Sequence, residues 1–339
     1  MRVIDQGDRD TFKNVWVVAE VLSGIVQPVT HELLGAAGEL AAALKSRVWA
    51  VVIGRGLLQD AQALFAYGAD TVILADDERF AGFCDEAEAA VISRLIREYR
   101  PEIILGAATA RGRALIPRVA VQTVSGLTAD CTGLAIDPEN GDLLQTRPAF
   151  GGNIMATIRC PEHRPQMATI RPQVMKAPLP QPGRGGELIR AEVLESDFMN
   201  AKKILQTVRS AEEGVNLSEA RVIVAGGRGV GGAKGFDLLR GLAQALGGAV
   251  AASRSAVDAG WISYAHQVGQ TGQTVQTEVY IACGISGQIQ HLVGMQSCQT
   301  IIAIDTNPDT PMMQIADIAI VGDLFQVVPV IIRELEGKA

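Results

Sequence analysis

The sequence predicts an α/β protein made of two parallel-sheet, Rossmann-like domains. Apolar runs without in-and-out alternation are separated by segments of helical periodicity, which is typical of parallel strands covered by helices on both faces. This alternation occurs twice, before and after a β-rich and then polar middle stretch. The length of 339 residues suits about two domains. Hydrophobic residues make up 48% of the chain, which is enough for two cores.

The first third of the chain predicts the sheet of the N-terminal domain. Strand-like apolar runs occur at residues 15–21, 48–53, 71–74 and 103–105. The segments between them carry apolar residues at helical spacing, as at Leu33, Ala37 and Leu40. We therefore expect parallel strands joined by helices.

An antiparallel portion is expected to complete this domain. Short β-rich pieces separated by turn signals occur at residues 133–136, 144–148, 154–159 and 167–171. Residues 177–186 are rich in proline and glycine and predict an exposed connection. We place the boundary in the polar stretch near residues 210–217, which gives an N-terminal domain over 1–210 and a C-terminal domain over 211–339.

The last third predicts a second, smaller parallel sheet. Strand candidates occur at residues 222–225, 249–252, 279–283, 301–304 and 318–321, and a helix is expected at 236–246. Strands that alternate with helical segments indicate a parallel α/β domain.

Composition excludes several kinds of partner and site. The net charge is −7 and the basic residues are scattered, so we expect no binding to nucleic acid or an anionic membrane. No apolar run approaches the ~20 residues of a membrane helix, and residues 1–13 lack the apolar segment of a secretion signal. The five cysteines are odd in number and form no CxxC pair, which favours free thiols in a reducing cytoplasm. The four histidines are too dispersed for a metal site.

A glycine-rich loop at residues 226–232 follows a predicted strand and precedes a predicted helix. It contains GxGxxG from Gly227 to Gly232 and can present backbone N–H groups and a helix N-terminus to a phosphate. Taken alone this signal is weak, and the alternative is an ordinary tight turn. A nicotinamide site expects an acidic residue after the next strand, where this chain has Ser253 and Arg254. A guanidinium there stabilises the negative charge that a flavin gains on reduction. The alternative is an exposed salt bridge.

Two further loops carry polar groups beside predicted strands. Residues 267–274 offer amides, hydroxyls and backbone N–H groups that suit a flavin edge or a pyrophosphate, and the alternative is a solvated hairpin. Residues 284–292 form a strand-to-helix turn with small residues and His291. A single histidine in an apolar helix is more often a satisfied core residue.

These motifs closely resemble the electron-transfer flavoprotein α family. The resemblance rests on Ser-Arg-Ser-Ala-Val-Asp-Ala-Gly-Trp at 253–261, Gln-Val-Gly-Gln-Thr-Gly at 267–272 and Tyr-Ile-Ala-Cys-Gly-Ile-Ser-Gly-Gln-Ile-Gln-His at 280–291. The loops at 226–232 and 321–325 add to it, as do residues 107–109, 117–118 and 126–131 of the N-terminal part. The resemblance thus covers nearly the whole chain.

The resemblance implies one FAD in the C-terminal domain. The implied contacts are Arg228, Ser253, Arg254, Gln267, Val268, Gly269, Gln270, Thr271, Ser286, Gly287, Gln288, Ile289, Gln290, His291, Asp305, Asp323 and Leu324. Arg254 is expected to stabilise the anionic semiquinone, Thr271 to bond near N5 and His291 near the C2 carbonyl. Asp305 replaces an asparagine that is frequent in the family, and a carboxylate accepts but does not donate.

The resemblance also implies partners. A smaller β subunit completes a heterodimer and holds a second FAD or an AMP, and the C-terminal domain swings on its linker to reach a dehydrogenase of the acyl-CoA type. The N-terminal domain is similar to the adenine-nucleotide hydrolases, with a vestigial nucleotide site and contacts to the β subunit.

Residues 1–13 resemble the extended start of anaerobic members, which favours electron bifurcation with NADH and a ferredoxin or flavodoxin. A simple carrier to the quinone pool is the alternative. A self-sufficient flavin or nicotinamide oxidoreductase is disfavoured, since the flavin motifs hold no acid-base pair. A nucleotide-binding regulatory protein would carry no flavin.

Overall fold

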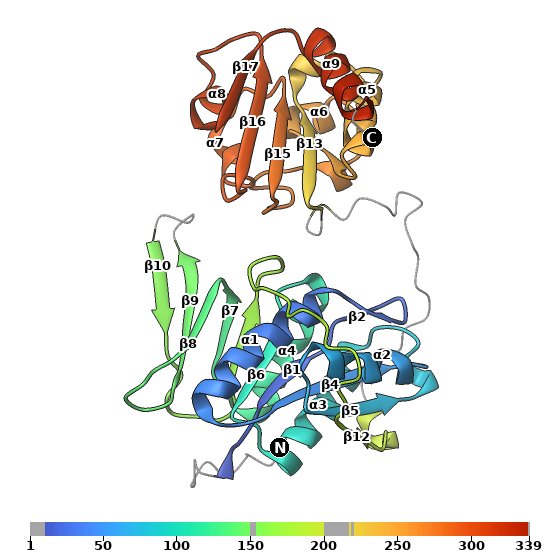
Figure 1. Ribbon diagram of the computed structural model, residues 1–339, viewed down its shortest axis with the longest axis vertical. Coiled ribbons are helices and arrows are strands. Elements are labelled where there is room, and N and C mark those ends of the chain that lie inside the picture. The colour runs from blue at the N-terminus through green and yellow to red at the C-terminus, as the bar shows by residue number, and fades with distance from the viewer. Residues whose placement is uncertain (1–10, 150–153, 200–216, 218–219, 338–339) are drawn as a thin grey trace. The chain divides into compact units, whose positions relative to one another are not determined.

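The computed structural model describes residues 11–149, 154–199, 217 and 220–337. The chain divides into two compact units, Met1–Thr207 (unit 1) and Val208–Ala339 (unit 2), each built on its own sheet (Figure 1). The boundary predicted near residues 210–217 lies outside the described residues, apart from Leu217.

Unit 1 is built on a seven-stranded sheet in which every neighbouring pair is parallel. Its order is β12-β5-β4-β1-β6-β11-β7. The strands are β1 (Val15–Val18), β4 (Val48–Gly54), β5 (Thr71–Asp76), β6 (Ile103–Ala107), β7 (Leu127–Cys131), β11 (Gln166–Ile170) and β12 (Glu187–Arg190). The four apolar runs of the first third form β1, β4, β5 and β6.

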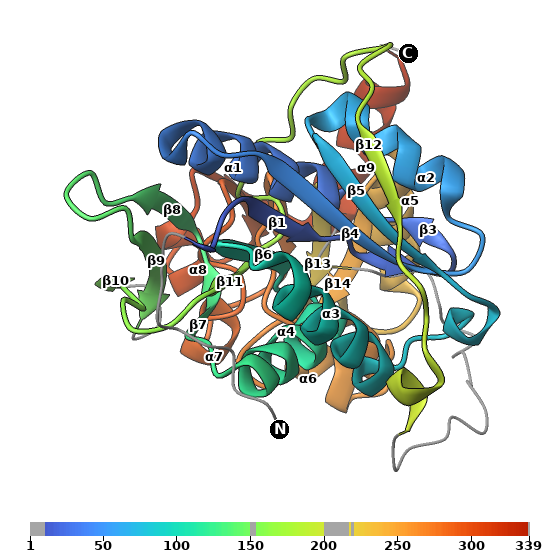
Figure 2. The same cartoon turned by 90° about the horizontal axis from the view of Figure 1, so that it is seen from below.

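Helices cover both faces of this sheet because alternate residues of each strand point to opposite sides. Val15 and Val17 pack with α1 and α2, whereas Trp16 and Val18 pack with α3 and α4. Figure 2 shows α1 and α2 on one side of the sheet and α3 and α4 on the other. These helices are α1 (Val29–Leu44), α2 (Leu58–Ala63), α3 (Asp85–Tyr99) and α4 (Ala110–Thr123). A short β2–β3 hairpin (Val21–Leu22, Ile25–Val26) follows β1, and 3₁₀ turns span Leu64–Tyr67, Glu78–Phe80 and Glu195–Phe198.

The antiparallel portion is smaller than expected. It has the strands β8 (Gly133–Ile136), β9 (Leu143–Ala149) and β10 (Ile154–Ile158), in the order β10-β9-β8. The expectation that residues 167–171 are antiparallel is wrong, because β11 pairs in parallel with both β6 and β7. All five residues of β11 are buried, and the interior of the parallel sheet is the place that buries both faces of a strand.

Unit 2 contains a five-stranded parallel sheet in the order β14-β13-β15-β16-β17. The strands are β13 (Val222–Gly226), β14 (Ala249–Ala252), β15 (Val279–Cys283), β16 (Thr300–Asp305) and β17 (Ile318–Val321). The helices are α5 (Gly235–Ala245), α6 (Arg254–Asp258), α7 (Ile289–Leu292), α8 (Pro311–Ile315) and α9 (Leu324–Glu336), with 3₁₀ turns at Arg228–Val230 and Tyr264–His266. The predicted class, an α/β protein with two parallel-sheet units and an added antiparallel portion, is confirmed.

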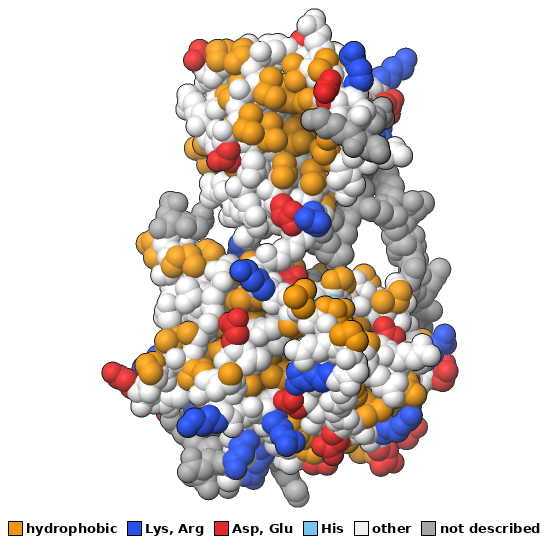
Figure 3. Space-filling view, in the orientation of Figure 1, with side chains coloured by type: hydrophobic (Ala, Val, Ile, Leu, Met, Phe, Trp, Pro, Cys, Tyr) orange, Lys and Arg blue, Asp and Glu red, His pale blue; other side chains and the backbone are white. Residues whose placement is uncertain are grey.

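The two faces of the unit 2 sheet are covered differently. Phe236 of α5 and Val328 of α9 pack on one face, while Tyr280 of β15 faces the loop around Val268 on the other. At the edge, β17 stays largely open, with Ile318 51% exposed. Figure 3 shows hydrophobic side chains gathered over this unit.

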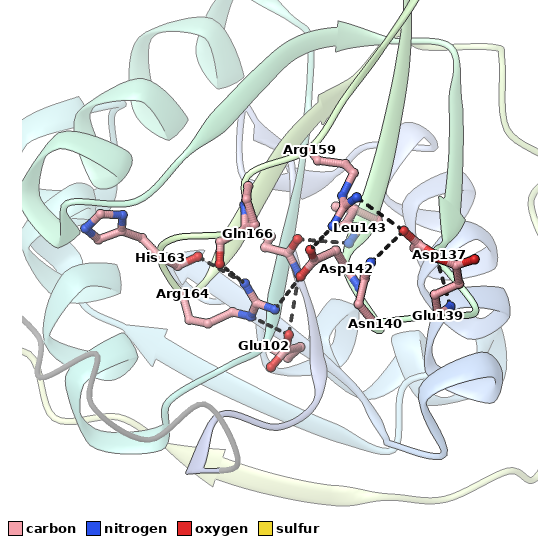
Figure 4. Close-up of polar contacts among 11 residues, drawn as sticks. Glu102, Asp137, Glu139, Asn140, Asp142, Leu143, Arg159, His163, Arg164 and Gln166 are labelled. Carbon is pink, nitrogen blue, oxygen red and sulfur yellow. Dashed lines mark hydrogen bonds and ion pairs between the residues drawn. The ribbon is translucent and has the colours of Figure 1, made fainter.

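An ion network within unit 1 joins the antiparallel sheet to the seven-stranded sheet (Figure 4). Arg164 is 4% exposed; its Nε bonds Glu102 at 2.5 Å and one terminal nitrogen bonds Asp142 at 2.9 Å. Arg159, just after β10, reaches the other oxygen of Asp142 at 2.7 Å. Burial acts to raise the pKa of Asp142, but the hydrogen bonds from the two arginines bring it below its ordinary value. The network joins the turn before β9 to the residue preceding β6.

Within the described ranges, no helix is both long and apolar enough to cross a membrane.

Candidate functional site

Unit 2 holds a cavity of about 580 Å³ at the carboxyl ends of its strands. The chain leaves β13 towards β14 on one side and later returns to β15 on the other, so β13 and β15 flank the point where the strand order reverses. Ligands of open parallel sheets bind at such a point. The cavity is lined by Gly227, Arg228, Gly229, Ser253, Arg254, Ser255, Asp258, Gln267, Val268, Gly269, Gln270, Thr271, Gly284, Ile285, Ser286, Gly287, Gln288, Gln290, His291, Asp305, Asn307 and Thr310.

The cavity gathers every site residue expected from the sequence except three. Ile289 is the first residue of α7 and is 74% exposed. Asp323 caps α9 by accepting a hydrogen bond from the Phe325 N–H at 2.9 Å. Leu324 is buried in the core beneath α9. These three lie outside the lining.

Eight lining residues are not among the FAD contacts named from the sequence, although six of them lie in the predicted loops and motifs. They follow the ends of β13, β14, β15 and β16 and are Gly227, Gly229, Ser255, Asp258, Gly284, Ile285, Asn307 and Thr310. Position alone is a signal for such residues, because the carboxyl ends of parallel strands meet at one edge of the sheet.

The glycine-rich loop lines the cavity and also packs closely against the loop after β15. A Cβ on Gly227 would lie 2.2 Å from the Gly284 carbonyl oxygen, and one on Gly229 would lie 2.7 Å from the Gly284 Cα. These glycines therefore let the loops after β13 and β15 touch, and the Gly227 and Gly229 N–H groups donate to the carbonyls of Cys283 and Gly284. The loop lies between β13 and α5 as predicted and reaches the cavity through Gly227, Arg228 and Gly229, but the N-terminus of α5, at Gly235, is not part of the lining.

The loop at residues 267–273 is folded against α7 and is not a solvated hairpin. Gln267 and Val268 are 2% and 1% exposed. The Gln270 N–H donates to the Gln290 carbonyl at 2.7 Å, and the Gln267 amide donates to the Thr271 hydroxyl at 3.1 Å. The Thr271 carbonyl accepts from the Tyr264 hydroxyl at 2.5 Å. Thr271 is thereby held at the cavity from both sides.

Arg254 brings a positive charge to the cavity. It begins α6 directly after β14, and its Nε lies 3.2 Å from the Asp258 carboxylate one helical turn later. The two side chains are 68% and 63% exposed, so water screens their attraction. Arg254 is thus both the exposed salt bridge of the alternative interpretation and a lining residue.

His291 is a buried lining residue with one nitrogen unpartnered. Its Nε2 lies 3.0 Å from the Tyr280 hydroxyl, whereas its Nδ1 is buried without a hydrogen-bond partner among the described residues. Burial lowers the pKa of His291 to about 4, against a smaller opposing effect of the Val268 backbone. The ring is therefore neutral at pH 7 and only half satisfied as a core residue.

These residues fit a flavin nucleotide. The unpartnered Nδ1 of His291 suits a polar ligand atom, Arg254 supplies a cation, and Gln270 and Ser286 supply neutral polar groups. A Cβ on Gly287, where φ is +81°, would lie 2.4 Å from the Met312 backbone nitrogen. Glycine therefore allows the cavity loop to pack directly against the backbone of α8. Among the described residues, no three His, Cys, Asp or Glu gather as metal ligands.

Comparison with protein families matches both units. Residues 15–196 match the family described as "Electron transfer flavoprotein domain". Residues 216–296 match the one described as "Electron transfer flavoprotein FAD-binding domain". The second match covers the strands β13 to β15 and most of the cavity lining.

Similar curated proteins extend over nearly the full chain. "Electron transfer flavoprotein subunit alpha" of Thermoanaerobacterium thermosaccharolyticum is 51% identical over 327 residues, covering 96% of this chain and 98% of that protein. "Protein FixB" of Clostridium saccharobutylicum is 47% identical over 95% of this chain and 96% of that protein. "Lactate dehydrogenase (NAD(+),ferredoxin) subunit LctC" of Acetobacterium woodii is 39% identical over 97% of this chain and 78% of that protein. The chain therefore belongs to the electron transfer flavoprotein alpha-subunit family.

Proposed function

We propose that this chain binds one FAD in the unit 2 cavity and passes electrons between a dehydrogenase and further redox partners as the alpha subunit of a heterodimer. The single observation that carries the proposal is the meeting of Arg254, Thr271 and His291 at one cavity on the carboxyl edge of the sheet. When bound, the flavin supplies the redox chemistry. The chain supplies charge, orientation and hydrogen bonds.

Arg254 acts on the charge of the ligand. A guanidinium keeps its charge at any physiological pH, and its attraction for a negative group grows as a ligand displaces water from the cavity. Asp258, 3.2 Å from the Arg254 Nε, opposes this effect. The balance between these two side chains sets how readily the site accepts added negative charge.

The polar walls orient the ligand. The Thr271 hydroxyl is proposed to bond near the flavin N5 and His291 near the C2 carbonyl, with Arg228, Ser253 and the remaining lining residues in supporting contacts. Asp305 accepts a hydrogen bond from the Asn307 N–H at 3.0 Å, so one of its oxygens is already partly used. We assign Asp305, Ile289, Asp323 and Leu324 to the adenosine and pyrophosphate end.

An apolar surface on unit 2 supports a protein partner, which we propose is the beta subunit. Four large hydrophobic side chains of β17 and α9 are 48–59% exposed: Ile318, Val321, Phe325 and Val330. The strand β17 is also the edge of its sheet. Large exposed apolar side chains next to an unpaired sheet edge are typical of an interface.

The identity of the redox partners is a further part of the proposal. We propose an acyl-CoA dehydrogenase-type partner and, through a second FAD in the beta subunit, NADH and a ferredoxin or flavodoxin. Similarity to a protein named as a subunit of an NAD(+),ferredoxin lactate dehydrogenase supports bifurcation. A simple carrier with AMP in the beta subunit is the second candidate, and 51% identity to a protein named only as an alpha subunit is compatible with it. The five free thiols support a reducing cytoplasm.

The deciding experiment is an anaerobic reductive titration of the chain co-purified with its beta subunit, with released flavin counted per heterodimer. Two FAD, both reduced by NADH, establish bifurcation. One FAD that is not reduced by NADH but is reduced through an acyl-CoA dehydrogenase establishes that the protein is a simple electron carrier. A heterodimer without flavin contradicts the proposed function, and NADH oxidation by the isolated chain would instead favour a self-sufficient oxidoreductase.

A further inference from the structure

The side chain of Tyr280 holds the imidazole of His291 from below the cavity. Tyr280 lies within β15 and is fully buried, and its hydroxyl is 3.0 Å from the His291 Nε2. In the part of the chain that the structure describes, this is the one hydrogen bond of that hydroxyl. The two rings lie 6.2 Å apart at 57°, so the contact is made edge-on through polar atoms.

The direction of this hydrogen bond follows from the number of protons. A tyrosine hydroxyl carries one proton, and a neutral imidazole has one N–H and one bare nitrogen. If His291 donated to Tyr280, the buried hydroxyl proton would have no acceptor, which is unfavourable. If Tyr280 donates to Nε2, both groups are satisfied. Burial raises the pKa of Tyr280 well above its ordinary value, so the hydroxyl keeps its proton.

The other ring nitrogen then carries the imidazole proton. Nδ1 is buried and has no hydrogen-bond partner among the described residues, while His291 lines the cavity. With Nε2 occupied by the tyrosine proton, Nδ1 is an N–H group. The Val268 backbone acts as a weak acceptor that opposes the fall of the His291 pKa, but no described group completes a hydrogen bond to Nδ1. A carbonyl or an anionic nitrogen or oxygen of a ligand completes it.

We propose that Tyr280 is a positioning residue for the cavity: by donating to Nε2 it keeps the His291 proton on Nδ1 and makes the histidine a neutral hydrogen-bond donor to the ligand. The identity of that ligand rests on the proposed function, whereas the tautomer is a property of the chain alone. The charge and the directional hydrogen bond are thereby divided between two residues. Arg254 supplies the charge and His291 supplies a donor that adds none.

The tautomer is measured by long-range ¹H–¹⁵N correlation spectra of the flavin-free heterodimer with ¹⁵N-labelled histidine. With the label in this chain alone, the His291→Asn variant identifies the His291 signals among those of the chain's four histidines. We expect the proton on Nδ1 at pH 7, and a shift towards the Nε2–H form in Tyr280→Phe. A proton on Nε2 in the unaltered protein, or spectra that Tyr280→Phe leaves unchanged, overturns the proposal. This outcome does not depend on FAD, so it is separable from failure of the proposed function.

A double-mutant cycle tests the consequence for binding. We expect Tyr280→Phe to weaken FAD binding about tenfold, the scale of one hydrogen bond. An asparagine amide takes the place of Nδ1 and donates without help from Tyr280, so in the His291→Asn background the same change should weaken binding less than about twofold. Equal losses in both backgrounds would mean that Tyr280 acts only on packing, and they overturn the proposal. Tyr99→Phe, in α3 of unit 1, is the matched control and should leave FAD affinity unchanged.

Discussion

The two parallel sheets of this chain differ in how the polar groups at their carboxyl edges are paired. In unit 1, Glu20 follows β1 and Thr109 follows β6, the two strands that flank the reversal of strand order. The Thr109 hydroxyl donates to Glu20 at 2.8 Å and accepts from the Gly112 N–H at 3.0 Å. In unit 2, the corresponding edge leaves the Nδ1 of His291 unpartnered at a cavity. One fold therefore yields either a self-satisfied edge or a binding edge, according to whether its polar groups are paired with each other.

The pairing in unit 1 is compatible with the expectation that its nucleotide site is vestigial. A helix N-terminus attracts anions, and at α4 the Glu20 carboxylate bonds the capping residue Thr109. In the neighbouring ion pair of Arg111 with Glu88, at 2.6 Å, the Glu88 carboxylate is buried and Arg111 is 14% exposed. A phosphate would have to displace a carboxylate, which supports the proposal that this edge no longer binds a nucleotide.

The largest expected effect is loss of the unit 1 ion network. Arg164→Ala removes the buried cation between the buried carboxylate of Asp142 and the partly buried one of Glu102, and breaking a buried pair costs about 3–5 kcal/mol. We expect that fall in the free energy of unfolding of unit 1, measured by urea denaturation, with FAD affinity kept. Arg55→Ala, which breaks an exposed pair with Glu78, should cost less than about 0.5 kcal/mol. Equal costs for the two variants would refute the contrast.

The second effect concerns the contact between two loops of unit 2. In Gly227→Ala the new Cβ would lie 2.2 Å from the Gly284 carbonyl oxygen and 2.8 Å from Ile285. We expect a loss of about 2–3 kcal/mol and at least tenfold weaker FAD binding, measured by calorimetry. Gly241→Ala in α5 meets only Ile332, at 3.6 Å, and should stabilise the unit slightly. Unchanged binding in Gly227→Ala would show that the loops need not touch.

The third effect is a pH dependence of the free energy of unfolding of unit 2, caused by His291. Burial lowers the pKa of His291 to about 4, so between about pH 6.5 and 4 the unfolded chain binds a proton that the folded chain rejects. The stabilisation is complete above pH 6.5 and is lost as the pH falls through this window. Between pH 7 and 5 the unaltered protein should lose about 2 kcal/mol more than His291→Asn. Parallel denaturation curves for the two proteins would exclude this role.

The smallest expected effect on stability is that of replacing Arg254, which should instead change the reduction potential of the bound flavin. Arg254→Ala should change the free energy of unfolding by less than about 0.5 kcal/mol, since its partner Asp258 is also exposed. The flavin should become harder to reduce, by roughly 30–60 mV, which is a tenfold change in equilibrium. Asp258→Ala is the matched opposite, because removal of the counter-charge should make reduction easier. A redox titration that neither variant shifts would remove Arg254 from the mechanism.

The site was predictable to the extent that its chemistry lies in contiguous loops. The segments 253–254 and 267–271 carry their polar groups immediately beside apolar strands, so residue type and order indicate a site. Asn307 and Thr310 were not predicted as lining residues because they follow β16 without a distinctive sequence pattern. Tyr280 was not predicted as a site residue because its proposed role depends on His291, which lies eleven residues away on another element. An aromatic residue in an apolar strand predicts burial and nothing of its hydroxyl.

The sequence by itself determined the two parallel α/β units, because uninterrupted apolar runs and helical periodicity are local properties that follow from burial on one or both faces. It did not determine that β11 enters the sheet between β6 and β7, or that the mixed segments of β7 and β12 become strands. Those outcomes depend on which edge of the sheet remains unpaired. Only the tertiary structure decided that Gly227 meets Gly284 and that Glu20 closes one edge while the other stays open. Hydrogen bonding and close contact join residues that are distant in sequence, and composition does not record that proximity.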